Sequence, residues 1–231
     1  KTNFSFVHHE PDSSFPNGIP NPILPETHLR NKKKILASKA DFGIAFDGDF
    51  DRCFFFDKNG NFVSGEYIVG LLAKIFLFKE PGAIIVHDPR VVWNVQNIVK
   101  FNGGKSVVSL TGHAFVKQTM RENKATYGGE LSAHHYFKDF SYCDSGMIPW
   151  LLVLEMMSRT DKTLSELISE QRLQFPSSGE INLNIQDISS ALKKVVDFYE
   201  EDRPQIHNFD GISLSFRTWR FNLRPSNTEP I

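Results

Sequence analysis

The chain has 231 residues, of which 40% are hydrophobic, and its formal net charge is −1. This is enough apolar material for one large or two smaller globular domains, while the dispersed lysines and arginines argue against a nucleic-acid-binding surface. No membrane partner is expected either, because the most apolar helical stretch, residues 68–78, is too short to cross a bilayer and contains Lys74.

The first 25 residues carry five prolines between positions 11 and 25, which favour an irregular, extended start. A helix is predicted over about 26–40, because its leucines and its isoleucine fall on one stripe with lysines opposite. Two apolar runs that are typical of β-strands follow, at 42–46 and 53–56.

The loop between these two runs holds three carboxylates, Asp47, Asp49 and Asp51, with Arg52 directly after them. Their i, i+2, i+4 spacing places alternate side chains on one side of an extended loop, so all three can converge. Three carboxylates that converge repel each other, and a divalent metal ion or a phosphate-bound Mg²⁺ usually lies between them. The loop therefore predicts a cation site, with a solvated acidic turn as the alternative.

Two other protein families have similar acidic loops. An EF-hand is excluded because Arg52 stands where that loop needs glycine, Lys58 stands where it needs a bidentate Glu, and β-type runs flank the loop. A dehalogenase-type phosphatase with Asp47 as nucleophile stays open, although Asp51 stands where that family has Thr or Val.

From residue 64 onward helical and strand-like segments alternate, which predicts a mainly parallel sheet covered by helices. The expected helices lie near 68–76, 92–101, 114–122, 146–158 and 163–171, and the expected strands at 83–87 and 105–110. In such sheets ligands gather at the carboxyl ends of the strands. The loops at 87–90, 111–113 and 128–134 are therefore candidates for one common site.

Several side chains in and near these loops are candidate ligand contacts. Arg90 and His113 follow strands, and Lys117 lies one turn beyond His113 on the same helix face. In Gly-Gly-Glu-Leu-Ser-Ala-His, residues 128–134, the glycines permit an unusual backbone from which Glu130 and Ser132 project on one side, suited to vicinal sugar hydroxyls. An ordinary glycine-rich turn is the alternative for this loop.

The clearest domain boundary is at 175–179, Phe-Pro-Ser-Ser-Gly. Beyond it a strand at 180–185, a helix at 188–199 and strands at 212–216 and 219–223 predict a small α+β domain. The chain then reads Arg-Pro-Ser-Asn-Thr-Glu-Pro. Arg224 offers a bidentate fork there, and short donors follow it, a set that suits a phosphate dianion; a common turn is the alternative.

Three of these loops, taken together and in this order, resemble the α-D-phosphohexomutase family, which includes the phosphomannomutases and phosphoglucomutases. They are Asp-Gly-Asp-Phe-Asp-Arg at 47–52, the glycine-rich loop at 128–134 and the terminal loop at 224–230. The resemblance spans nearly the whole chain. It is greatest to the bacterial phosphomannomutase branch, through residues 84–90 and 132–150.

The resemblance implies an α/β protein with mixed, mainly parallel sheets and flanking helices, followed by a small α+β C-terminal domain, within a four-domain enzyme. Residues 1–62 would be the C-terminal part of the metal-binding domain, 63–174 the sugar-binding domain and 175–231 a truncated phosphate-binding domain. The N-terminal phosphoserine domain of the same polypeptide would be missing, since no Thr-Ala-Ser-His-like stretch occurs and the chain begins at Lys1. We therefore expect a fragment that is inactive alone.

The family roles carry over residue by residue. Asp47, Asp49 and Asp51 would hold Mg²⁺, and Arg52, His113 and His134 would be catalytic. The sugar would contact Glu130, Ser132, His134, Arg90 and Lys117, and the substrate phosphate would contact Arg224, Ser226, Asn227 and Thr228.

The resemblance implies interconversion of mannose 6-phosphate and mannose 1-phosphate, so a hexose phosphate is the expected substrate. Glu130 and Ser132 would bind hydroxyls that glucose and mannose share, which leaves a phosphoglucomutase or a dual-specificity enzyme as an alternative. A non-catalytic sugar-phosphate-binding module is a further alternative. Two cysteines are too few for a disulfide framework, and Cys53 lies in an apolar run, so a cytoplasmic location is expected.

Overall fold

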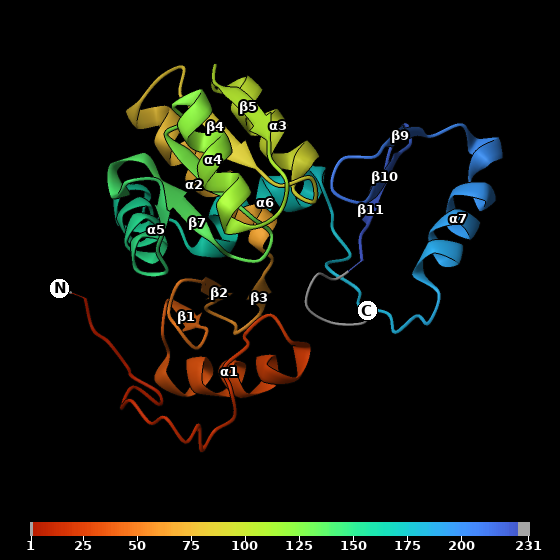
Figure 1. The fold of residues 1–231 in the computed structure, drawn as a ribbon. Helices are drawn as coiled ribbons and strands as arrows, with labels where there is room; N and C mark the ends of the chain where they lie inside the picture. The colour runs from red at the N-terminus through yellow and green to blue at the C-terminus, as the bar shows by residue number, and fades with distance from the viewer. Residues whose placement is uncertain (1, 226–231) are drawn as a thin grey trace.

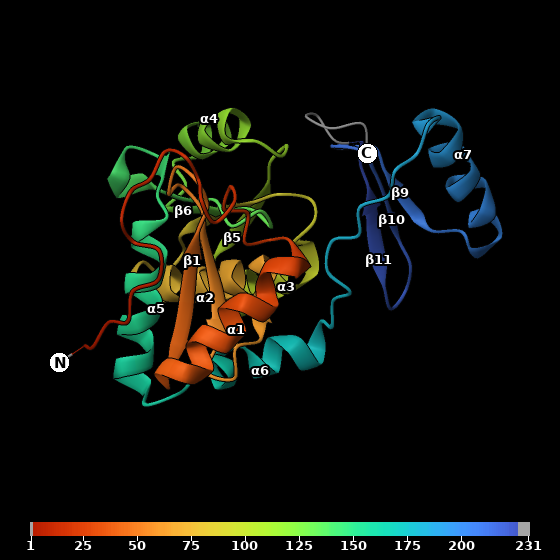
Figure 2. The ribbon, with the colours of Figure 1, turned by 90° about the horizontal axis from the view of Figure 1, so that it is seen from below.

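A computed structural model describes residues 2–225 of the chain (Figures 1 and 2). Within that range the chain forms three β-sheets and seven α-helices, which confirms the expected mixed α/β class. We name three stretches: the N-terminal unit (residues 2–63), the middle unit (64–175) and the C-terminal unit (180–225). None of the helices between residues 2 and 225 combines the length and the apolarity needed to cross a bilayer.

In the N-terminal unit one helix lies against a small antiparallel sheet. The helix α1 (Pro25–Ser38) has a proline in its first turn, where a backbone N–H has no partner inside the helix, and it ends at Lys39 in the left-handed conformation. The sheet has the order β1-β2-β3, with β1 (Phe42–Phe46), β2 (Cys53–Asp57) and β3 (Phe62–Val63). Side chains of β2 and β3 pack into the core of the middle unit, so the two units share one core.

The middle unit is a five-stranded sheet of order β5-β4-β6-β7-β8 with helices on both faces. Figure 2 shows α4 on one side of this sheet and α2 and α3 on the other. Successive side chains of β4 pack against these two helix layers in turn. Ile85 belongs to the core beneath α2 and α3, whereas Val86 packs with Val116 and Met120 of α4. The elements are α2 (Gly65–Lys79), β4 (Ile84–His87), α3 (Val92–Phe101), β5 (Lys105–Val108), α4 (His113–Asn123), β6 (Tyr127–Gly129), β7 (His135–Phe137), the 3-10 helix η1 (Lys138–Phe140), β8 (Cys143–Asp144), α5 (Met147–Thr160) and α6 (Leu164–Gln174).

The sheet of the middle unit is half parallel and half antiparallel. Strand β4 pairs in parallel with β5 and β6, as the helix–strand alternation predicts, but β6, β7 and β8 pair antiparallel. The change of direction occurs because the loop at 130–134 returns the chain directly, without a crossover helix. Strands β7 and β8 are only three and two residues long, too short to produce a periodic pattern in the sequence.

The C-terminal unit is a three-stranded antiparallel sheet of order β11-β10-β9 with one α-helix beside it (Figure 1). Its elements are α7 (Ile188–Phe198), the 3-10 helix η2 (Glu200–Asp202), β9 (Gln205–His207), β10 (Ile212–Ser215) and β11 (Arg220–Leu223). The two strands expected near 212–216 and 219–223 and the helix expected at 188–199 are therefore present.

The prediction of a strand at 180–185 is wrong, because this segment has an irregular backbone. Its alternating apolar side chains are exposed, with Ile181 at 70% and Leu183 at 62%. Alternation produces a strand only where a neighbouring strand supplies hydrogen bonds and a surface that covers the apolar side chains. Across residues 2–225 no strand pairs with this segment. The three-residue strand β9, conversely, carries no sequence signal of its own.

Candidate functional site

The three aspartates of the acidic loop converge where β1 ends and β2 begins. Asp47 is buried, Asp51 is half-buried and Asp49 is exposed, and one carboxylate oxygen of each lies within 4.8 Å of the other two. The antiparallel pairing of Phe46 with Cys53 closes this loop, and the turn passes through Phe50 in the left-handed conformation. The tertiary structure thus brings together the three carboxylates that the spacing predicts.

Arg52 partly neutralises this loop. Its Nε donates to Asp47 Oδ2 at 2.6 Å and its backbone amide donates to Asp47 Oδ1 at 3.2 Å. Burial by itself would raise the pKa of Asp47, but the hydrogen bonds and charge of Arg52 outweigh it and the net shift is downward. Asp51 shifts the other way, because burial and the nearby Asp47 and Asp49 raise its pKa more than His134 lowers it.

This donor set fits a hard divalent cation. Three carboxylates face one guanidinium, so the loop keeps a negative excess, and all the available ligand atoms are oxygens of the kind that Mg²⁺ prefers. Burial raises the pKa of Asp51 most, and repulsion from Asp47 and Asp49 adds to it; a bound cation would remove that repulsion.

The glycine-rich loop is the hairpin connection between β6 and β7. Its backbone is tight, since the amide of Glu130 donates to the carbonyl of His134 and Ala133 has a positive φ of 70°. Ser132 does project into the loop, where its Oγ lies 3.0 Å from His134 Nδ1.

Glu130, however, is buried and held on both of its carboxylate oxygens. The amide of Gly112 donates to Oε1 at 2.8 Å, and the hydroxyl of Tyr136 donates to Oε2 at 2.5 Å. Burial, followed by the adjacent charge of Glu130, raises the pKa of the Tyr136 hydroxyl, so it stays a donor. The structure therefore adds Tyr136, which was not predicted, although it lies two residues after His134 and so on the same face of an extended chain.

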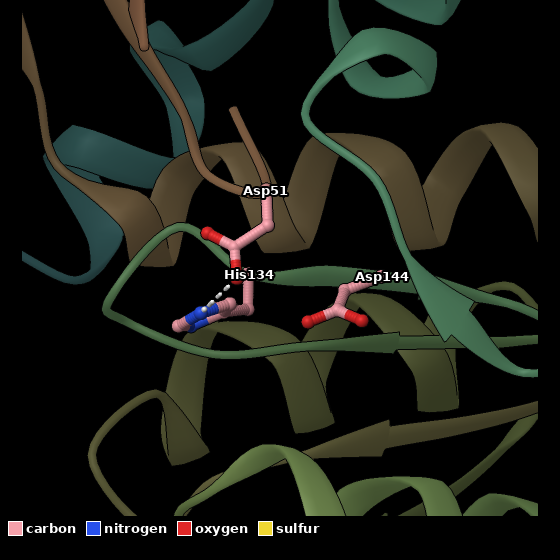
Figure 3. Close-up of side chains that lie close together, drawn as sticks. All are labelled: Asp51, His134 and Asp144. Atoms are coloured by element: carbon pink, nitrogen blue, oxygen red, sulfur yellow. Dashed lines mark ion pairs between the residues drawn. The ribbon is translucent and has the colours of Figure 1, made fainter. Parts of the chain in front are cut away.

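The acidic loop and the glycine-rich loop contact each other directly. His134 Nε2 lies 3.3 Å from Asp51 Oδ2, and the amide of Cys53 donates to the carbonyl of Ala133 at 3.3 Å. Figure 3 shows this ion pair with Asp144 beside it. Asp144 does not add to the negative excess, because Lys117 Nζ lies 2.7 Å from its carboxylate.

A second buried carboxylate ties the glycine-rich loop to the end of β4. Asp88, which is fully buried, accepts from Arg90 Nη2 at 2.7 Å and from the amide of Leu131 at 2.9 Å. Burial opposes ionisation of Asp88, but Arg90 outweighs it and the pKa of Asp88 is lowered. Arg90 also lies 3.4 Å from Glu180, so its guanidinium is already engaged by two carboxylates.

Arg224 is joined to the same set of loops through Asp210. Its Nε lies 3.4 Å from Asp210 Oδ1, while Asp210 Oδ2 accepts from the amide of Thr111 at 2.9 Å. Asp210 was not predicted, because it lies in a loop and its partners are distant in the sequence. The predicted phosphate contacts Ser226, Asn227 and Thr228 lie outside the described residues.

The contacts of two predicted residues differ from those that the sequence suggests. His113 is the first residue of α4 and is exposed, and within residues 2–225 its side chain makes no hydrogen bond or ion pair. Lys117 faces Asp144 and the ring of Tyr136, 5.8 Å from the ring centroid, instead of sharing an anion with His113. The other described candidates form one chain of contacts, from Asp51 through His134, Glu130 and the 111–112 loop to Asp210 and Arg224.

Two family models match most of the chain. A model described as phosphoglucomutase/phosphomannomutase, alpha/beta/alpha domain II, matches residues 1–60, and the domain III model of the same family matches residues 64–175. The chain is 58% identical over 226 residues to a phosphomannomutase of Vibrio cholerae, covering 97% of this chain and 49% of that protein. It is 53% identical over 228 residues to "phosphohexose mutases" of Xanthomonas campestris pv. campestris, covering 99% of this chain and 51% of that protein.

A solved structure shares the fold. A phosphoglucomutase/phosphomannomutase family protein from Burkholderia thailandensis superimposes with a TM-score of 0.79 at 30% sequence identity, covering 95% of this chain and 47% of that one. The chain spans about half the length of the curated relatives it matches.

Proposed function

This chain belongs to the phosphoglucomutase/phosphomannomutase family, the α-D-phosphohexomutases, and on that premise we propose that it is part of a phosphomannomutase, an isomerase of mannose 6-phosphate and mannose 1-phosphate. The observation that carries the proposal is the chain of contacts from Asp51 through His134 and Glu130 to Asp210 and Arg224. It joins the acidic loop of the N-terminal unit, the glycine-rich loop of the middle unit and the guanidinium of Arg224 in the C-terminal unit.

In this proposal the phosphoryl group moves between O1 and O6 of the hexose through a hexose 1,6-bisphosphate. The donor is a phosphoserine supplied by another part of the same polypeptide, since no Thr-Ala-Ser-His-like stretch occurs in these 231 residues. Residues 1–62, 63–174 and 175–231 then contribute parts of the metal-binding, sugar-binding and phosphate-binding domains. A cytoplasmic location accords with the free cysteines Cys53 and Cys143.

Asp47, Asp49 and Asp51 would hold Mg²⁺, which supplies charge neutralisation at the transferring phosphoryl group. The residues of the chain do the positioning. Arg52 keeps Asp47 ionised and in place, and Asp51 orients His134 through its ion pair. Asp51 thereby connects the acidic loop to His134 of the glycine-rich loop.

On the sugar side, Glu130 and Ser132 would bind vicinal hydroxyls, and His134 would move a proton at the attacking hydroxyl. Glu130 keeps lone pairs for this while it accepts from Gly112 and Tyr136, because a carboxylate has about four lone-pair sites. It is 1% exposed, however, so its surroundings would have to open for a hydroxyl to reach it. Arg90 and Lys117 would be further sugar contacts, and His113 would be a further catalytic residue. Arg224, with Ser226, Asn227 and Thr228, would hold the phosphate that does not react.

The decisive experiment compares this chain with its full-length parent polypeptide. The parent should convert mannose 1-phosphate to mannose 6-phosphate in the presence of Mg²⁺, and the 231-residue chain alone should not. Asp49→Asn in the parent should lower kcat/KM by about a hundredfold or more, because a cation ligand is lost. Asp41→Asn, an exposed aspartate just before β1, is the matched control and should leave kcat/KM unchanged.

Three results would point elsewhere. An acid-stable phosphate adduct on Asp47 would favour the dehalogenase-type phosphatase. Ligand-dependent thermal stabilisation without turnover in the parent would favour a binding module. A kcat/KM for glucose 1-phosphate equal to that for mannose 1-phosphate would make the enzyme a dual-specificity phosphohexomutase, as shared recognition of hydroxyls by Glu130 and Ser132 allows.

A further inference from the structure

A crevice of about 800 Å³ lies between the middle unit and the C-terminal sheet, next to the contacts described above but lined by other residues. Figure 1 shows the sheet β9–β11 beside α3. Arg220, which lines the crevice, and Arg224 stand at opposite ends of β11, about 13 Å apart along an extended strand. Neither Arg224 nor Arg90 lines the crevice.

One wall of the crevice is cationic and polar. The strand register places Ser215 beside Arg220 and Ser213 beside His207 on one face of the sheet. Arg217, from the turn between β10 and β11, and Arg203, which follows η2, line the same wall. Asp202 is the one carboxylate among the described lining residues, so the wall carries a positive excess.

The arginines of the crevice differ from those of the candidate site in their charged partners. Within residues 2–225 none of Arg203, Arg217 and Arg220 forms an ion pair, whereas Arg52 and Arg224 do. Arg220 is half-buried, and its guanidinium donates only to neutral oxygens, the carbonyl of Pro89 at 2.9 Å and the hydroxyl of Ser213 at 3.2 Å. No carboxylate of residues 2–225 lies within ion-pair distance of this guanidinium, although the charge of the buried Asp88 acts on it, so it can still pair with an anion.

The opposite wall is apolar and aromatic. It is formed by Trp93 with Pro89 and Val92 at the start of α3, and by Val108 at the end of β5. The hydrogen bond from Arg220 to Pro89 joins the two walls. A ligand in the crevice therefore meets Trp93 and aliphatic side chains on one side, and guanidinium groups together with Phe209 and Phe216 on the other.

We propose that this crevice binds a nucleoside diphosphate. The planar fork of a guanidinium group can donate two parallel hydrogen bonds to the oxygens of a phosphate. A heterocyclic base can lie against the Trp93 side of the crevice. The volume is within the range of sites for ligands of this size. A hexose phosphate would satisfy the cationic wall but would leave the apolar wall without a flat partner.

The test is isothermal titration of this chain with ADP and with UDP, each at up to about 1 mM, a concentration that detects sites of micromolar to millimolar affinity. The double variant Arg203→Ala/Arg217→Ala should weaken binding about ten- to hundredfold through lost charge-assisted hydrogen bonds. Trp93→Leu should also weaken it. The matched control Arg121→Ala/Arg159→Ala removes two exposed arginines on α4 and α5 and should leave the affinity unchanged.

The proposal is supported if both nucleotides bind, if the crevice variants and not the control weaken binding, and if added salt weakens the wild type more than the double variant. It is overturned if neither nucleotide binds, if pyrophosphate binds as tightly as ADP, or if the variants keep wild-type affinity. Displacement of ADP by mannose 1-phosphate would also overturn it, because the ligand would then occupy the substrate site.

Discussion

At the scale of single residues, the central feature is a set of buried charged groups that are paired rather than free. Glu130 and Asp88 are buried, yet each accepts hydrogen bonds from a backbone amide and from a side chain. Burying a charged carboxylate without partners would cost several kcal/mol, so these donors offset the burial of both groups. The donor to Glu130 that can be removed by substitution is the hydroxyl of Tyr136.

Replacing Tyr136 by Phe should lower the free energy of unfolding by about 1–3 kcal/mol, because one hydrogen bond to a buried carboxylate is lost. Urea unfolding of this chain measures the change. In the full-length parent the same variant should also raise KM for mannose 1-phosphate, since Glu130 would be less well oriented. Tyr142→Phe is the control, because the hydroxyl of Tyr142 makes no hydrogen bond among residues 2–225.

His135 makes stability depend on pH. It is fully buried beside Tyr127, and burial, with a smaller contribution from the charge of His134, lowers its pKa from 6.5 to about 3. Between pH 6.5 and about 3 the unfolded chain therefore binds a proton that the folded chain does not, so stability falls as the pH falls through this window. The slope attributable to His135 is at most about 1.4 kcal/mol per pH unit.

Chemical unfolding at several pH values between 4 and 7 tests this expectation. His135→Gln, which keeps an acceptor for Tyr127, should have a shallower dependence than the wild type. His207→Gln replaces an exposed histidine and should keep the wild-type slope. Parallel slopes in all three proteins would show that His135 is not the titrating group.

At the scale of elements, local sequence signals and local geometry agree best at α6. Thr163-Leu-Ser-Glu166 is a capping-box sequence, and both of its reciprocal bonds are present. The strand expected at 180–185 has an equally clear local pattern and does not form. The difference is that a capping box closes within one turn, whereas a strand requires a partner from elsewhere in the chain.

Thr163→Ala should therefore cost about 1 kcal/mol of unfolding free energy, the usual value of an N-cap hydroxyl. Thr160→Ala is the matched control, because its hydroxyl donates to a carbonyl inside α5 and its loss should change stability little. Denaturant midpoints of the two variants, measured with an unchanged m-value, decide whether the capping box contributes as expected.

At the scale of the whole molecule, the C-terminal unit is held on the middle unit by a few polar contacts rather than by a shared apolar core. The contacts are Asp210 with Thr111, Arg220 with Pro89, and Glu180 with Arg90. The first of these also positions Arg224 against the strand ends of the middle unit. Because these contacts are few and polar, the unit that carries Arg224, the proposed phosphate contact, can change its position at a small cost in free energy.

Asp210→Ala should release one of these contacts. In this chain it should increase the rate of proteolytic cleavage in the exposed segment 176–187, while Asp197→Ala, an exposed aspartate on α7, should not. In the parent enzyme Asp210→Ala should raise KM for the hexose phosphate more than it lowers kcat, because Arg224 loses its orientation. An unchanged KM would mean that Asp210 does not position Arg224.

The sequence by itself determined the seven α-helices, the strands β1, β2, β4, β5, β10 and β11, the capping box, and the loops at 47–52 and 128–134. These follow from periodicity, turn residues and short spacing, all of which act over a few residues. Only the tertiary structure decided that Glu130 is buried beneath Tyr136 and Gly112, that Asp88 and Asp210 tie the loops together, and that residues 180–185 stay unpaired. Such partners come from segments as far apart as 99 residues, and no local pattern encodes a contact that exists only once the chain has folded.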